Sequence, residues 1–121
     1  AAVADFDADG DLDLVVANFN APPYLLRNDS PAKHALRLQL VEQNGRPSFG
    51  ARVRVAVAGG RTIHRELANA GGYLTQSSAI LHVGIGDAEK VERIDIDYPG
   101  GPHTLQKEAP NVGGVVRVVR E

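Results

Sequence analysis

The sequence predicts an all-β fold, an antiparallel β-sandwich that carries a short N-terminal extension. Three observations support this prediction. Apolar residues recur at every second position in several short stretches, a period typical of strands with one buried face. Turn residues, such as the pair Gly59-Gly60, interrupt these stretches at short intervals. No amphipathic pattern of helical period continues for the length of an ordinary helix, about 10 residues.

Composition sets the size and excludes several classes of protein. The chain has 121 residues, of which 43% are hydrophobic and 23% charged, values typical of one globular domain with a packed core. No apolar run approaches the roughly 18 residues that a membrane-spanning helix needs. The absence of cysteine excludes disulfides and thiolate metal sites. With a net charge of −2 and few aromatic residues, a nucleic-acid-binding protein is not expected.

The strands can be placed by their alternation. The clearest patterns run from Leu36 to Leu40, from Val53 to Val57 and from Ile94 to Tyr98. Weaker candidates are Asp13 to Ala17, Tyr24 to Arg27, Thr62 to Leu67, Ile80 to Val83, His103 to Lys107 and Val115 to Val119.

Two pairs of residues have an ordinary structural interpretation. We expect Gly84 and Gly86 to form a turn, because no helix or third glycine follows them as in a nucleotide-binding loop. Asp95 and Asp97 are expected to line a solvated strand face, because they alternate with apolar residues.

The first 30 residues differ from the rest of the chain. Five aspartates and no basic residue lie in residues 1–13, and turn residues cluster from Asp29 to Lys33. The sequence therefore predicts a short segment, residues 1–30, and a β domain, residues 31–121. A strand or hairpin is marginally stable in water on its own, so we expect the N-terminal segment to dock on the β domain or on a partner.

The acidic segment has the composition of a calcium loop. Its aspartates occupy alternate positions around a turn at Gly10: Asp5, Asp7, Asp9, Asp11 and Asp13. Calcium takes six to eight oxygen ligands, and a tight loop can point alternate side chains at one centre. We assign Asp11 a backbone-carbonyl role with its side chain in solvent, and the other four aspartates are assigned as side-chain ligands.

A calcium loop of this kind has three alternatives. Magnesium is less favoured than calcium, because it keeps several waters and seldom uses an all-protein cage. An EF-hand is not expected, because position 12 of the loop is Val16 and a strand pattern follows instead of a helix. An acidic solvated turn without metal is the third alternative. Carboxylates about 6 Å apart repel by roughly 0.7 kcal/mol per pair even in water, which favours a bound cation.

Two further surfaces are candidate ligand sites. Arg52 and Arg54 share the polar face of one strand, and with Arg37 and Arg65 they form either a stripe for sulfate or carboxylate groups or scattered solvated arginines. The glycine-rich loop that contains Tyr73 and Gln76 either contacts a sugar or is a long turn bonded to its own domain.

Two parts of the chain resemble known families. The aspartate loop, the strand after it and Tyr24-Leu25-Leu26-Arg27-Asn28-Asp29 resemble the end of an FG-GAP/VCBS repeat, the blade unit of integrin-α-like β-propellers. The rest resembles the ASPIC/UnbV domain of cartilage acidic protein-like proteins. The matching motifs are His34-Ala35-Leu36-Arg37-Leu38, Asn44-Gly45-Arg46, Phe49-Gly50-Ala51-Arg52-Val53, Gly71-Gly72-Tyr73-Leu74-Thr75-Gln76-Ser77-Ser78, Leu81-His82-Val83-Gly84-Ile85-Gly86 and Ile96-Asp97-Tyr98-Pro99-Gly100-Gly101.

The resemblance implies a noncatalytic calcium-binding interaction or adhesion module of a secreted, cell-surface or periplasmic protein. Its expected partners are a protein or glycan ligand and a preceding β-propeller, with no nucleic acid and no membrane span. Two alternatives stay open: an accessory carbohydrate-binding domain of a larger enzyme, and a structural cap that closes the propeller.

Overall fold

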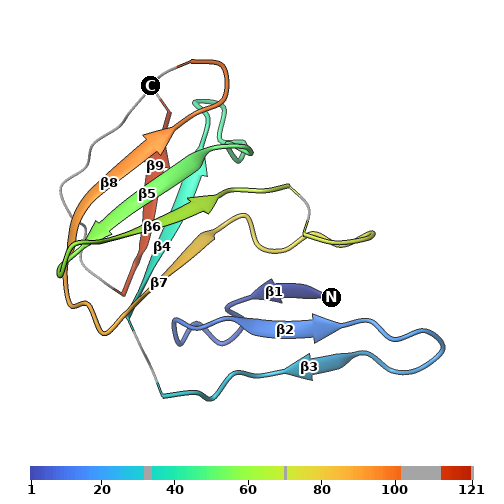
Figure 1. The fold of residues 1–121 in the computed structure, drawn as a ribbon. Helices are drawn as coiled ribbons and strands as arrows, with labels where there is room; N and C mark the ends of the chain where they lie inside the picture. Colours follow the sequence, from blue (N-terminus) through green and yellow to red (C-terminus); the bar gives the residue numbers. More distant parts are fainter. Residues whose placement is uncertain (32–33, 70, 102–112, 121) are drawn as a thin grey trace.

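The described part of the chain consists of β-strands joined by turns and loops. The computed structural model describes residues 1–31, 34–69, 71–101 and 113–120, and these residues contain nine strands and no helix. The strands form three sheets of three strands each (Figure 1). The prediction of an all-β, sandwich-like fold is confirmed.

The first sheet is built from the N-terminal segment. Strands β1 (Ala2–Ala4), β2 (Asp13–Val16) and β3 (Tyr24–Leu26) pair antiparallel in chain order. The sequence patterns did not identify β1. In Figure 1 this sheet, drawn in blue, lies beside the two larger sheets with β1 nearest to them.

The second sheet has the order β7-β4-β9. Its central strand β4 (His34–Val41) pairs antiparallel with β7 (Leu81–Gly86) and parallel with β9 (Val115–Val119). The sheet is therefore mixed, and the expectation of purely antiparallel strands is wrong for this pair. A parallel pair needs a long crossover connection, and a period-two pattern gives no signal for it.

The third sheet has the order β6-β5-β8 and is antiparallel throughout. It consists of β6 (Arg61–Glu66), β5 (Arg52–Val57) and β8 (Val91–Asp97). The alternation predicted for β5 is confirmed: its valines are buried, whereas Arg52 is exposed and Arg54 half-buried.

The core lies between the second and third sheets. Alternate side chains of both sheets form one cluster, in which Leu38, Val55 and Ile85 are fully buried. Strands β6 and β7 lie side by side at one edge, where Arg61 donates a hydrogen bond of 2.7 Å to the Ile85 carbonyl. The two sheets thus pack as a sandwich, and no residue of the N-terminal sheet belongs to the cluster.

Two local expectations were wrong, and one falls outside the described residues. Gly84 and Gly86 belong to β7 and do not form a turn. Asp95 is 4% exposed, because the side chains of Arg54 and Arg93 lie over it. The strand expected from His103 to Lys107 lies outside the described residues.

Candidate metal centre

The acidic loop joins β1 to β2, and Asp13 holds its two ends together. The pairing of these strands places Ala4 opposite Asp13. The Asp13 carboxylate accepts hydrogen bonds from the backbone N–H groups of Asn28, at 2.9 Å, and Phe6, at 2.8 Å. These bonds, first from Asn28 and then from Phe6, lower the pKa of Asp13 and keep it ionised. Gly10 adopts φ +104°, so the turn predicted at this glycine is confirmed.

Three of the five aspartates converge on one point. Carboxylate oxygens of Asp5, Asp7 and Asp13 lie within 4.8 Å of one another. Oδ1 of Asp5 is buried and has no hydrogen-bond partner among the described residues. Burying a carboxylate oxygen without a hydrogen-bond donor costs free energy, and a bound metal ion is one group that can offset this cost.

The other two aspartates differ from their assigned roles. Oδ1 of Asp9 accepts a hydrogen bond of 3.1 Å from the Asp11 N–H, and Asp9 does not belong to the converging group. The Asp11 side chain was expected in solvent, but its Oδ1 is buried and unpaired among the described residues. Burial, and then the charges of Asp9 and Asp13, raise the pKa of Asp11. The loop therefore carries more negative charge than its own hydrogen bonds compensate.

The donor set suits calcium chemically. It offers only hard carboxylate oxygens, at a spacing at which one ion can contact three side chains, and backbone carbonyls or water can complete its coordination. Three of the four side chains that the sequence assigned as ligands are the ones whose oxygens converge, and their binding of an ion stays a prediction. The sequence could not predict that Asp9 turns toward a backbone N–H, because that depends on the conformation of the loop.

The acidic loop contacts the outer face of the second sheet. Arg37, on β4, forms an ion pair of 2.5 Å with Asp5. A cavity of about 200 Å³ lies at this contact, lined among others by Leu12 of the loop and His82 of β7. Burial, and then the charge of Arg37, lower the pKa of His82, so the neutral imidazole is favoured there.

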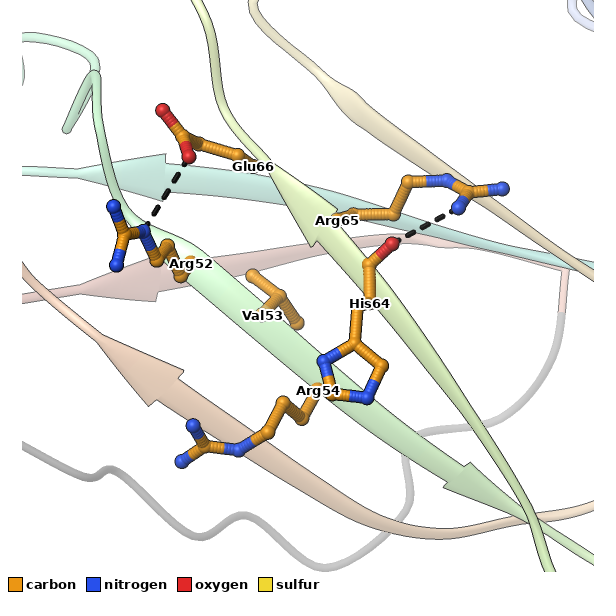
Figure 2. A pocket seen from close by; sticks show the side chains of 6 residues that line it. All are labelled: Arg52, Val53, Arg54, His64, Arg65 and Glu66. Carbon is orange, nitrogen blue, oxygen red and sulfur yellow. Dashed lines mark hydrogen bonds and ion pairs between the residues drawn. The ribbon is translucent and has the colours of Figure 1, made fainter.

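Arg52 and Arg54 lie in a second candidate site, a shallow hollow on the outer face of the third sheet. The hollow has a volume of about 320 Å³, and Figure 2 shows the six residues that line it: Arg52, Val53, Arg54, His64, Arg65 and Glu66. His64 lies directly opposite Arg54 on the neighbouring strand. Sequence reasoning missed His64, because which residues face each other across two strands depends on the register.

Carboxylates neutralise part of this hollow. Arg52 pairs with Glu66 at 3.4 Å, as Figure 2 shows, and Arg54 pairs with Asp97 at 2.7 Å. Arg37 lies on the other sheet, so the expected stripe of four arginines is wrong. Arg65 lies opposite the buried Val53, and its side chain points away from Arg52 and Arg54 in Figure 2, so Arg52 and Arg54 are the arginines whose side chains share the outer face.

The loop between β6 and β7 does not join either site. Tyr73 is 90% exposed, Gln76 is exposed, and neither lines the hollow. Ser77 Oγ accepts a hydrogen bond of 3.3 Å from the Val3 N–H, and the Ser78 N–H donates one of 3.2 Å to the Val3 carbonyl. Both serines therefore bond to the backbone of the N-terminal sheet and not to that of their own β domain, which neither interpretation of this loop predicted.

Comparison with known proteins identifies the family of the larger part of the chain. Within the described residues, no helix has the length and apolar character needed to cross a membrane. No curated protein matches the sequence. An FG-GAP repeat was not detected, so that part of the resemblance stays a prediction. The family model described as ASPIC and UnbV matches residues 41–119, from the last residue of β4 to the last residue of β9. Because this match covers more than half of the 121 residues, the chain belongs to the ASPIC and UnbV family.

Proposed function

We propose that this chain is a noncatalytic calcium-binding interaction module of an exported protein. One observation carries the proposal: the carboxylates of Asp5, Asp7 and Asp13 converge within 4.8 Å, and a buried oxygen of Asp5 has no donor among the described residues. The family is one of extracellular-type modules, which agrees with export and with a calcium-rich surrounding. Millimolar calcium fills even weak sites of extracellular modules.

The role of the ion in this proposal is structural. It neutralises the clustered aspartates and fixes the loop between β1 and β2, and it stabilises the folded chain by mass action. The N-terminal sheet and its ordered loop then form a surface beside the sandwich to which a partner can bind. We also propose that residues 1–30 are the end of an FG-GAP/VCBS-type repeat that continues a preceding propeller.

Calorimetric titration tests the calcium site. Asp7→Asn removes one of the three converging charges but keeps the side-chain shape, so we expect calcium affinity to fall at least about tenfold, because affinity follows the number of charged ligands. The control is Glu66→Gln, which removes one negative charge from the third sheet and leaves the loop intact. A wild-type titration without heat of binding, at several temperatures, would refute the site.

A second candidate function is binding of an acidic glycan at the hollow on the third sheet. The observation that favours it is that the side chains of Arg52, Arg54 and His64 lie on the same face of β5 and β6 and line the hollow. Arginine pairs with sulfate and carboxylate groups through two parallel hydrogen bonds.

Retention on immobilised heparin, a sulfated polysaccharide, tests this candidate. The double variant Arg52→Gln/Arg54→Gln should elute at clearly lower salt than the wild type, because two of the contacts to sulfate are lost. The variant Arg46→Gln/Arg117→Gln removes the same charge outside the hollow and should elute with the wild type. Equal loss of retention in the two double variants would indicate attraction by net charge alone.

A further inference from the structure

Arg37 is the cation that joins the acidic loop to the β domain. Its Nη1 donates to Asp5 Oδ2, and its Nη2 donates to the Gly113 carbonyl at 2.7 Å. The side chains of Arg37 and Asp5 are only 15% and 12% exposed, so water and salt screen this pair weakly. The guanidinium therefore fixes the orientation of the Asp5 carboxylate from the side of the β domain.

The other oxygen of the same carboxylate is the unpaired one. Oδ1 of Asp5 is buried without a hydrogen-bond partner among the described residues, and Asp5 belongs to the group that converges with Asp7 and Asp13. A carboxylate has about four lone-pair sites, so it can accept from a guanidinium at one oxygen and bind a metal at the other. Asp5 thus connects the β domain to the centre of the loop.

Two further hydrogen bonds join the N-terminal sheet to the loop before β7. Val3 exchanges one hydrogen bond each with Ser77 and Ser78, at 3.3 and 3.2 Å, and β3 is exposed along its whole length. Exposed hydrogen bonds contribute little net stability, about 1 kcal/mol each. Docking of this sheet on the sandwich is therefore sensitive to a change at Asp5.

We propose that Arg37 is a positioning residue of the calcium site, and that calcium binding and docking of the N-terminal sheet on the sandwich reinforce each other through Asp5. The inference deepens the proposed function and rests on it. An ion that orders the loop holds Asp5 in place for Arg37, and docking on Arg37 orients Asp5 for the ion. Such a coupling is reciprocal, so each event strengthens the other by the same factor.

Two backbone amides report on the two events separately. The Phe6 N–H bonds to Asp13 inside the loop, whereas the Ser78 N–H bonds to Val3 across the docking contact. We would measure hydrogen exchange of both amides by NMR on the whole chain, with calcium and with a chelator. In the wild type we expect calcium to slow exchange at both.

Arg37→Lys separates positioning from charge, because lysine keeps the positive charge but lacks the planar fork that holds Asp5 and Gly113 together. In this variant we expect calcium still to slow hydrogen exchange of the Phe6 amide. It should slow exchange of the Ser78 amide at least threefold less than in the wild type. Calcium itself should bind about three- to tenfold more weakly. Arg117→Lys, on β9, is the matched control and should behave as the wild type.

The outcomes distinguish this inference from the calcium proposal. If calcium leaves Phe6 unchanged in the wild type, the calcium site itself is refuted. If calcium slows exchange of the Phe6 amide but not of the Ser78 amide in the wild type, calcium binds but the coupling is refuted. The coupling is also refuted if calcium slows exchange of the Ser78 amide equally in Arg37→Lys and in the wild type. The wild-type comparison decides the matter even where the variant does not fold.

Discussion

Three aspartates show how their surroundings determine what a carboxylate does in this chain. Asp13 accepts two backbone N–H groups, which lower its pKa. Asp95 lies buried beneath Arg54 and Arg93, at 4.0 and 2.7 Å from their nitrogens. Asp11 is surrounded by like charges, and burial raises its pKa first. The sequence pattern placed each of these residues on a loop or strand face, but it did not show that Asp13 meets Asn28 or that Asp95 meets Arg54, because these partners come from other parts of the chain.

Tyr98 is a buried residue whose hydroxyl has no hydrogen-bond partner within the described part of the chain. Its side chain is 4% exposed, and its hydroxyl makes no hydrogen bond with the described residues. Arg120 lies over the ring at 5.4 Å from the centroid. Burial, and then the charge of Glu42, raise the pKa of Tyr98. The ring therefore stabilises the fold, whereas the hydroxyl costs desolvation free energy.

Tyr98→Phe should raise the free energy of unfolding by about 1 kcal/mol, because it removes an unpaired buried hydroxyl and keeps the ring under Arg120. Urea unfolding at pH 8 measures the difference. A loss of more than 1 kcal/mol would show that the hydroxyl has a partner in solution.

The raised pKa of Tyr98 also predicts how the stability gained in Tyr98→Phe depends on pH. A pKa raised above the unfolded value of 10.0 means that the folded state resists ionisation of Tyr98. The unfolded chain then gains stability as its tyrosine ionises, so the wild type should lose stability relative to Tyr98→Phe as the pH rises above 10. Below pH 10 the difference between the two proteins should be constant, and paired urea titrations at pH 8 and pH 10.5 measure it.

At the scale of elements, β7 contains two glycines with different requirements. Gly84 pairs with Ala35, and a Cβ built on it meets nothing within 4 Å. Gly86 has φ +67°, and a Cβ there comes within 3.5 Å of an Arg61 nitrogen. Only the second glycine is required by the conformation of the backbone.

Gly84→Ala should raise the free energy of unfolding by about 0.5 kcal/mol or more, because alanine loses less backbone entropy in a strand. Gly86→Ala should lower it by about 1 kcal/mol, because a Cβ is unfavourable at positive φ. Urea unfolding of both variants gives the comparison. A similar loss of unfolding free energy in both variants would indicate that both glycines lie in a turn, and it would contradict their assignment to β7.

The strands that the sequence predicted are those with one clean apolar face. Alternation identified β4, β5 and β8, because apolar and polar residues alternate along part of each of these strands. It missed β1, which has three residues, and the end of β7, where glycines stand on the outer face. The parallel pairing of β4 with β9 is a long-range contact for which the local pattern contains no signal.

The candidate site was predicted in the same way, from local spacing. The alternating aspartates identified the loop, and Gly10 identified its turn. Arg37 as the partner of Asp5 and His64 as the neighbour of Arg54 lie 32 and 10 positions away in the chain, and only strand pairing and docking bring them together. Spacing within one segment thus identified the acidic loop, and tertiary structure determines which side chains from other elements lie next to it.

For the whole molecule, the arrangement of the core indicates which part folds by itself. The buried cluster begins at Leu36 and ends at Val118, and it contains no residue of the N-terminal sheet. Val118, on the C-terminal strand β9, is 2% exposed and completes the cluster against β4. The family match, residues 41–119, covers nearly the same part of the chain.

A fragment of residues 31–121 should therefore retain a single cooperative unfolding transition, with a free energy of unfolding within about 1–2 kcal/mol of the whole chain. The fragment loses the ion pair of Arg37 and two exposed hydrogen bonds, and Arg37 becomes exposed to water, so no buried charge is left unpaired. By contrast, a chain that ends before Gly113 loses β9 and one wall of the core, and it should show no cooperative transition. Circular dichroism during urea titration measures both fragments. If residues 31–121 unfold without a transition, the N-terminal sheet is part of the folding unit, and the proposed coupling through Asp5 would then describe contacts within one domain.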